Sequence, residues 1–265
     1  MPSPAHDTGV PVEQFAVLSE TGIVLHGFTL RIPGLDVKTD RATALQRLDK
    51  YHALALTGRT RSLRLARQVH GKGIAVVDRK SAKITPDVDG LITSDVGVTL
   101  GIYVADCCAI YLVDPIRKVI GLVHSGKKGT ALNIAGECVR EMRKAFGSDP
   151  THIVAQLSPC IRPPNYEIDF AAGICRQLQN AGVRRVRDCC ENTGADLDRF
   201  YSYCVEKGPT GRMLAFLALR YRRAGIPHRL AVRYAGVLFP RKKQPVRQSQ
   251  TGTSTQLMSA IVDIC

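Results

Sequence analysis

The sequence predicts an α/β protein built on a mixed sheet, and two observations carry this prediction. Short runs rich in valine, isoleucine and leucine alternate with longer segments whose apolar residues recur at helical spacing. Several strand-like runs also follow one another with only a turn between them, which indicates antiparallel neighbours beside parallel ones. With 265 residues and 45% hydrophobic side chains, the chain is long enough to bury one sizeable core.

The individual elements follow from the same patterns. Strands are predicted at 15–20, 22–32, 62–71, 73–78, 89–93, 98–115, 118–126 and 152–158, because these stretches are apolar and bounded by turn-forming residues. Helices are predicted at 40–56, 127–147, 170–182 and 211–225, where apolar residues repeat every three or four positions. The first helix has an acidic first turn, and Gly147 closes the second.

The basic charge is concentrated near the C-terminus. The net charge is +14, and residues 220–265 hold seven arginines, two lysines and one aspartate, a net +8 that leaves +6 for the first 219 residues. Beyond about residue 225 the apolar periodicity fades into a polar, basic stretch, so we expect a folded domain at 1–225 and a mobile basic extension at 226–265. RNA binding through this extension is an alternative, but it lacks an aromatic stacking motif and resembles a solvated charged tail, so nucleic acid is not the favoured partner.

The chain has the character of a cytoplasmic protein. Its N-terminus lacks the basic start and apolar core of a secretory signal, and no apolar run approaches the roughly 20 residues that a membrane span needs. Nine cysteines form an odd number without the spacing of a small disulfide framework, which fits reduced thiols. We therefore expect no membrane partner.

One apolar run is interrupted in a way that indicates a site. Within VADCCAIYLVDP, residues 104–115, Asp106 and Cys107 would be costly to bury without a partner. His70 and His124 also stand where predicted strands end, 37 residues before and 17 after Cys107. Imidazole and thiolate both suit zinc, and three protein ligands leave the open position that catalytic zinc requires. The spacing alone leaves a structural alternative open, in which the histidines are hydrogen-bonded and the cysteine packs as a small apolar residue.

The segment after His124, SGKKGT at 125–130, suggests a second kind of chemistry. A strand followed by this turn and a predicted helix places backbone N–H groups, a helix dipole and two lysines beside the histidine, which favours an anion such as phosphate. A solvated turn with surface lysines is the alternative. The glycine and lysine spacing is not that of a Walker loop.

Six motifs together resemble one family. RQVHG, DGLIT, VADCCAIYLVDP, GLVHSGKKGT, SPCIRPPNYEI and FYSYCVEKGPTGRM occur in the order and approximate spacing of the YfiH-like proteins, called both laccase-domain polyphenol oxidases and purine nucleoside phosphorylases. The resemblance runs from about residue 25 to about residue 219 and implies a layered α/β sandwich forming a catalytic domain. It also implies a zinc site made by His70, Cys107 and His124, with copper less favoured, and Asp106 orienting a ligand or the substrate. Cys108 is assigned to packing.

The activity that this resemblance implies is cleavage of purine nucleosides, principally adenosine and inosine, by phosphate. Deamination of adenosine and cleavage of methylthioadenosine are further activities of the family. One alternative is hydrolysis of a peptidoglycan precursor that carries a wrong amino acid, with Cys107 as nucleophile and a histidine as base. Another is copper-dependent oxidation of polyphenols, for which the chain has few histidines in suitable motifs.

Four further residues are expected to bind substrate. Lys127 and Lys128 stand where the family usually has tryptophan and arginine, and a lysine keeps the charge but loses the bidentate fork that matches phosphate oxygens. Arg162 stands where the family tends to have a small residue, so it either restores a cation or faces solvent. Gln68 belongs to the RQVHG motif beside the first histidine.

Overall fold

The computed structural model describes residues 9–57 and 62–220, and within them the chain forms two six-stranded mixed sheets. The first sheet has the order β1 (Val12–Glu13), β2 (Val24–Thr29), β12 (Met213–Leu219), β7 (Val98–Val104), β3 (Ser62–Ala66) and β5 (Ile84–Thr85). The second has the order β11 (Arg185–Asp188), β10 (Val154–Leu157), β8 (Cys108–Asp114), β9 (Val119–Ser125), β6 (Gly90–Thr93) and β4 (Ile74–Val76). Each contains parallel and antiparallel pairs, which confirms the predicted mixed α/β class.

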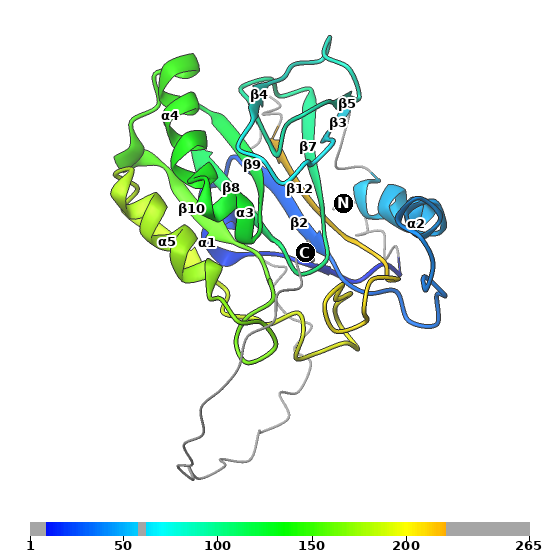
Figure 1. Cartoon of the computed structure of the whole chain (residues 1–265). Helices are drawn as coiled ribbons and strands as arrows, with labels where there is room; N and C mark the ends of the chain where they lie inside the picture. Colours follow the sequence, from blue (N-terminus) through cyan, green and yellow to red (C-terminus); the bar gives the residue numbers. More distant parts are fainter. Residues whose placement is uncertain (1–8, 58–61, 221–265) are drawn as a thin grey trace, which may run out of the picture. The chain divides into compact units, whose positions relative to one another are not determined.

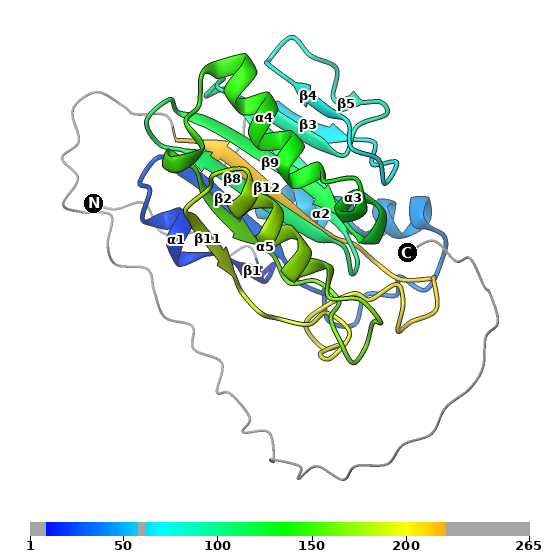
Figure 2. The same ribbon diagram turned by 60° about the vertical axis from the view of Figure 1, so that its left-hand side comes forward.

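The sheets and helices form layers, with two main cores. Figure 1 shows α4 (Ile134–Phe146) and α5 (Phe170–Asn180) on one side of the sheets and α2 (Arg41–Leu56) on the other, and Figure 2 shows α4 and α5 running across the second sheet. One core lies between the two sheets, and the other lies between the second sheet and α4 and α5. Leu56 of α2 packs with Leu214 and Phe216 on the outer face of the first sheet. None of the helices described here has the length and apolar character to cross a membrane.

Strand β8 explains the paired cysteines at 107 and 108. All seven residues of this strand are buried, and the first six alternate between the two cores because successive side chains point to opposite faces. Cys108 lies in the core beneath α4 and α5, as predicted for a packing residue, whereas Cys107 faces the core between the sheets. Burial raises the pKa of the Cys108 thiol, so this group stays protonated.

The predicted helix at 211–225 is wrong, because residues 213–219 form strand β12. This strand pairs with both β2 and β7 in the middle of the first sheet, and all seven of its side chains are buried. A strand buried on both faces loses the apolar-polar alternation that distinguishes a strand from a helix. Residues 221–225, like the predicted extension at 226–265, lie outside the described residues.

Three smaller predictions also need correction. The single strand expected at 98–115 is two strands, β7 and β8, which belong to different sheets. The helix expected at 127–147 is divided into α3 (Lys127–Ala131) and α4, because Asn133 adopts a left-handed conformation with φ of 58°, which asparagine tolerates better than most residues. The strand expected at 15–20 is the four-residue helix α1 (Ala16–Ser19). A single long helix dipole therefore does not begin at the SGKKGT turn.

Candidate metal centre

Three connections between the sheets meet at one place. The chain passes from the first sheet to the second between β3 and β4, between β5 and β6, and between β7 and β8. His70 lies in the first connection, Asp89 at the end of the second and Cys107 in the third. His124 comes from β9, which pairs with both β6 and β8. Residues distant in sequence are thereby brought together by strand order.

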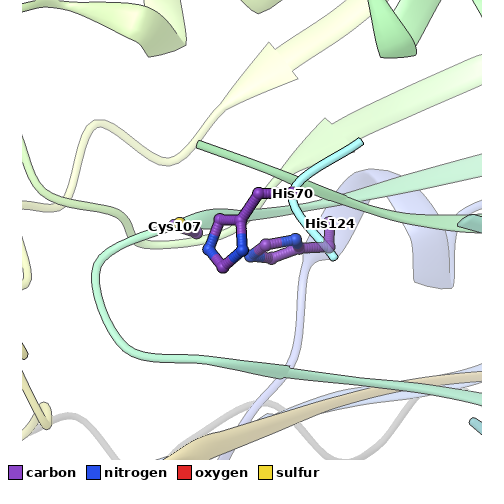
Figure 3. Close-up of side chains that lie close together, drawn as sticks. All are labelled: His70, Cys107 and His124. Atoms are coloured by element: carbon purple, nitrogen blue, oxygen red, sulfur yellow. The ribbon is translucent and has the colours of Figure 1, made fainter. Parts of the chain in front are cut away.

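His70, Cys107 and His124 form the cluster that the sequence predicts (Figure 3). Their donor atoms all lie within 4.8 Å of one another, and the two imidazole rings are 4.8 Å apart and nearly perpendicular. Ligand atoms around a tetrahedral zinc ion are roughly 3.3–3.8 Å apart, so small side-chain adjustments are enough to close the site around an ion. Cys107 and His124 are buried and His70 is half-buried, so the least covered ligand is His70.

Asp89 holds two of the three ligands, and it is the site residue that the sequence analysis missed. Its fully buried carboxylate accepts hydrogen bonds from His124 Nδ1 at 2.8 Å and from the backbone N–H groups of Val69, His70 and Gly71 at 3.1, 2.9 and 2.8 Å. Since a carboxylate accepts, Nδ1 of His124 carries the proton and Nε2 presents its lone pair to an ion. Burial alone raises the pKa of Asp89, but the bonds from His124 and the backbone outweigh it and hold the pKa below its usual value.

His70 is held in the form that binds metal. Burial, and then the electrostatic interaction with His124, lower the pKa of His70 from 6.5 to about 4, so the ring is neutral near neutral pH. Its backbone has a φ of 59°, and Gln68 has a φ of 58°. These left-handed residues form a tight turn around the Asp89 carboxylate, in a conformation that such residues rarely adopt without surrounding support.

Gly126 makes room for the Cys107 sulfur. A Cβ atom at position 126 would lie 2.5 Å from Sγ of Cys107, closer than van der Waals contact allows. The glycine in the predicted SGKKGT turn therefore serves the thiol beside it.

Asp106 lies next to a ligand in sequence but is hydrogen-bonded elsewhere. Its carboxylate accepts from Oγ1 of Thr193 at 2.8 Å and from the backbone N–H of Cys204 at 2.7 Å, and its carbonyl oxygen accepts from the N–H of Ile161. It thus ties together three segments that surround the cluster. The carboxylate that orients a histidine ligand is Asp89, not the predicted Asp106.

Two of the expected substrate-binding residues have structural partners. Both ends of the Gln68 amide bond the backbone of Tyr103, at 2.6 Å to its carbonyl oxygen and 3.0 Å from its N–H, so this side chain clamps the end of β7. The Arg162 guanidinium pairs with Asp188 and donates to the carbonyl oxygen of Glu191, so it faces neither solvent nor an open anion site. Contact with substrate is therefore not expected from either side chain.

The two lysines of the SGKKGT turn differ from each other. Lys127 is exposed and pairs with Glu167 at 3.1 Å. Lys128 is exposed, and its charge acts on His70, lowering the pKa of that ring. Lys128 is therefore the lysine that borders the cluster.

The chain is similar to a known family in sequence and in fold. Residues 33–172 and 164–220 match the family model described as multi-copper polyphenol oxidoreductase laccase. The chain is 31% identical over 195 residues to the purine nucleoside phosphorylase YlmD of Geobacillus stearothermophilus, covering 58% of this chain and 70% of the relative. It is 33% identical over 183 residues to a purine nucleoside phosphorylase of Deinococcus radiodurans, covering 58% and 69%. The crystal structure of the Geobacillus YlmD matches with a TM-score of 0.63 and 27% identity, covering 75% of this chain and 92% of that one, which confirms the layered α/β fold.

Proposed function

The chain belongs to the multi-copper polyphenol oxidoreductase laccase family, which confirms the YfiH-like resemblance, and we propose that it is a zinc-dependent purine nucleoside phosphorylase. The observation that carries the proposal is the buried cluster of His70, Cys107 and His124, held by Asp89. The names of the relatives supply the substrate class, since both are purine nucleoside phosphorylases.

The donor set favours a single zinc ion. Two neutral imidazoles and a thiolate are ligands that zinc binds well, and three protein ligands leave a position open. Within the described ranges this is the one His, Cys, Asp or Glu cluster tight enough to hold a metal, and the whole chain has seven histidines, few for several copper ions. A bound zinc ion supplies a Lewis acid that polarises a coordinated oxygen.

The proposed reaction replaces the bond between the ribose and the purine by a bond between the ribose and phosphate. A phosphate oxygen attacks C1′ of the nucleoside, the bond from C1′ to the purine nitrogen breaks, and its electron pair leaves with the purine, which takes up a proton. The products are the free purine and ribose 1-phosphate. Lys128 would hold the phosphate beside the cluster, while Asp89 keeps His124 in the tautomer that presents Nε2 to the ion.

Further aspects of the function form part of the same proposal. Adenosine deamination by water, and cleavage of methylthioadenosine, are two additional reactions for the same site. We assign catalysis to residues 1–225. We also place the enzyme in the cytoplasm, since the eight cysteines in the described part of the chain form no disulfide.

The test combines metal analysis with product detection. Purified protein should contain about one zinc per chain, and with inosine or adenosine it should release the purine and ribose 1-phosphate only when phosphate is present. Cys107→Ala should lose most of the metal and the activity. Cys108→Ala is the matched control, since this neighbouring thiol points into the other core.

Two results would count against the proposal. Full zinc occupancy in Cys107→Ala would remove the metal assignment. Conversion of adenosine to inosine, without ribose 1-phosphate under any condition, would replace phosphorolysis by hydrolytic deamination.

A further inference from the structure

Three cationic side chains border the metal cluster. Lys128 and Arg41 both act on His70, and Arg212 interacts electrostatically with Cys107. None of the three forms an ion pair with a carboxylate anywhere in residues 9–57 and 62–220. Cations held close together without an anion repel one another, so their site favours a negatively charged ligand.

Other well-covered arginines of the same fold are satisfied in different ways. Arg31 pairs with Glu206 at 2.6 Å, and Arg162 pairs with Asp188. Arg64 pairs with no carboxylate of the described residues, but all three of its guanidinium nitrogens donate to backbone carbonyl oxygens. The arginines beside the metal cluster therefore differ from these in having donor groups to spare.

Arg212 has guanidinium N–H groups that can donate to a ligand. Among the residues that the structure describes, only Nη1 of Arg212 has hydrogen-bond partners, the carbonyl oxygens of Thr210 at 3.0 Å and Gly211 at 2.8 Å. The guanidinium carbon lies 5.7 Å from the centre of the Tyr203 ring, which supports the group from one side. The charge of nearby Asp106 favours the guanidinium, but its carboxylate oxygens bond Thr193 and Cys204, and within the described residues it forms no ion pair with Arg212. Nε and Nη2 remain as donors in the planar geometry that matches a phosphate.

Arg41 approaches the same place from a different element. It is the first residue of α2, whose start is fixed by the Asp40 side chain through the N–H groups of Ala42 and Thr43 at 2.9 and 3.1 Å. Its charge acts on three groups at once, the ring of His70, the phenol of Tyr103 and the guanidinium of Arg212. Helix α2 thus carries a cation to the border of the cluster.

We propose that Arg41 and Arg212, together with Lys128, form a phosphate subsite beside the metal cluster. The proposal rests on the proposed phosphorolysis and names the residues that hold its attacking group. Arg212 supplies the bidentate fork that a lysine at position 128 lacks. The subsite is assembled from the first residue of α2, the first turn of α3 and the segment before β12, with no contribution from Arg162.

The experiment measures phosphate binding with and without turnover. Inorganic phosphate is titrated calorimetrically into the zinc-loaded full-length chain, and the phosphate concentration for half-maximal purine release from inosine is measured separately. Arg212→Gln should weaken phosphate in both assays by about tenfold or more, as expected for lost charged hydrogen bonds, while the KM for inosine changes by less than about twofold. Arg41→Gln should weaken phosphate by roughly threefold to tenfold, and Arg212→Lys should restore part of the loss.

Arg47→Gln is the matched control, because Arg47 lies on the same helix as Arg41 but pairs with Asp36. It should leave phosphate binding unchanged. Arg41 is exposed, so its variant tests the subsite even if the half-buried Arg212 variants unfold. Wild-type affinity for phosphate in Arg41→Gln and in any folded Arg212 variant, or no phosphate binding by the wild type, would overturn the subsite. If the chain binds phosphate through these arginines but does not cleave nucleosides, the subsite stands and the proposed reaction falls.

Discussion

Replacing Asp89 by asparagine tests whether this buried carboxylate holds the metal site together. Oδ1 accepts from His124 Nδ1 and the His70 N–H, and Oδ2 accepts from the N–H groups of Val69 and Gly71. Asparagine keeps one oxygen and places an NH₂ donor where the other oxygen was. In either orientation of the amide, two hydrogen bonds are lost, and the new NH₂ group faces the N–H groups that donated to the replaced oxygen.

The expected magnitude follows from this count. Each hydrogen bond to a charged group contributes about 1.5–3 kcal/mol, so the loss of two should lower the free energy of unfolding by about 3–6 kcal/mol. For a protein of this size that corresponds to a fall in Tm of roughly 6–24 °C. Zinc affinity should fall by about 10- to 100-fold, because His124 loses the partner that fixes its tautomer.

Asp114→Asn is the control for burial. Asp114 is also fully buried, but within residues 9–57 and 62–220 its Oδ1 accepts from the N–H groups of Ile116 and Arg117, whereas its Oδ2 has no hydrogen-bond partner. Its amide can therefore keep both bonds, so stability should change by less than about 2 kcal/mol and zinc affinity should not change. The assays are thermal unfolding of apo and zinc-loaded protein and competition for zinc with a chelator.

The pH dependence of the free energy of unfolding gives an independent test of this role of Asp89. The pKa of Asp89 is lowered below its usual 3.8 in the folded state, so its contribution to stability is present above that value and is lost as the pH falls through the folded-state pKa. The stability gap between wild type and Asp89→Asn should therefore narrow in acid. A variant that bound zinc like the wild type and melted within a few degrees of it would refute this account of Asp89.

Four other predictions follow from the same structure. Gly126→Ala should weaken zinc binding by about tenfold or more in chelator competition, because the new Cβ collides with the Cys107 sulfur; unchanged affinity would contradict this. Burial, then the charge of Glu191, raise the pKa of Glu13 to about 7, so its ionisation destabilises the fold as the pH rises from about 4.5 to 7. Glu13→Gln should then raise the free energy of unfolding by on the order of 1–2 kcal/mol near pH 8 but not near pH 5 in denaturant titrations, and equal effects at both would argue against it. Lys128→Arg should lower the phosphate concentration needed for half-maximal purine release and Lys128→Ala should raise it, each by on the order of 1 kcal/mol, with adenosine deamination affected much less. Truncation after residue 225 should leave nucleoside turnover nearly unchanged, since the family match ends at residue 220; loss of folded protein would show that the removed segment packs on the core.

The three residues of the metal cluster could be predicted from the sequence, but Asp89, which supports them, could not. His70, Cys107 and His124 stand at strand ends in recognisable motifs, so their residue types and motifs identify them. The role of Asp89 depends on the turn at 68–71 wrapping around its carboxylate, a contact made across about 20 positions that no local pattern encodes. The only sequence clue is an acid directly before a buried strand in DGLIT. Asp106 offers a similar clue but is bonded away from the cluster.

The fold was predicted in class but not in every element. Strands β6 and β9 are apolar, short and bounded by turns, so local composition identifies them. Strands β7 and β8 were predicted as one run because no glycine or proline separates them in the sequence. Strand β12 was taken for a helix because its burial on both faces is set by β2 and β7, which are more than 100 positions away in the sequence. The break at Asn133 depends on a backbone conformation that asparagine permits but does not require.

The proposed metal ligands and two of the proposed phosphate-binding residues come from separate parts of the chain, and this division bears on how such a protein can diverge. His70 and Cys107 lie in connections between the sheets and His124 lies on β9, whereas Arg41 is in the first turn of α2 and Arg212 is in the segment before β12. Substitutions in those two segments can alter the charge and shape presented to a substrate while the ion keeps its ligands. Selection can therefore retune which anion or nucleoside is accepted without rebuilding the reactive centre, so chains that share the three ligands need not share a substrate.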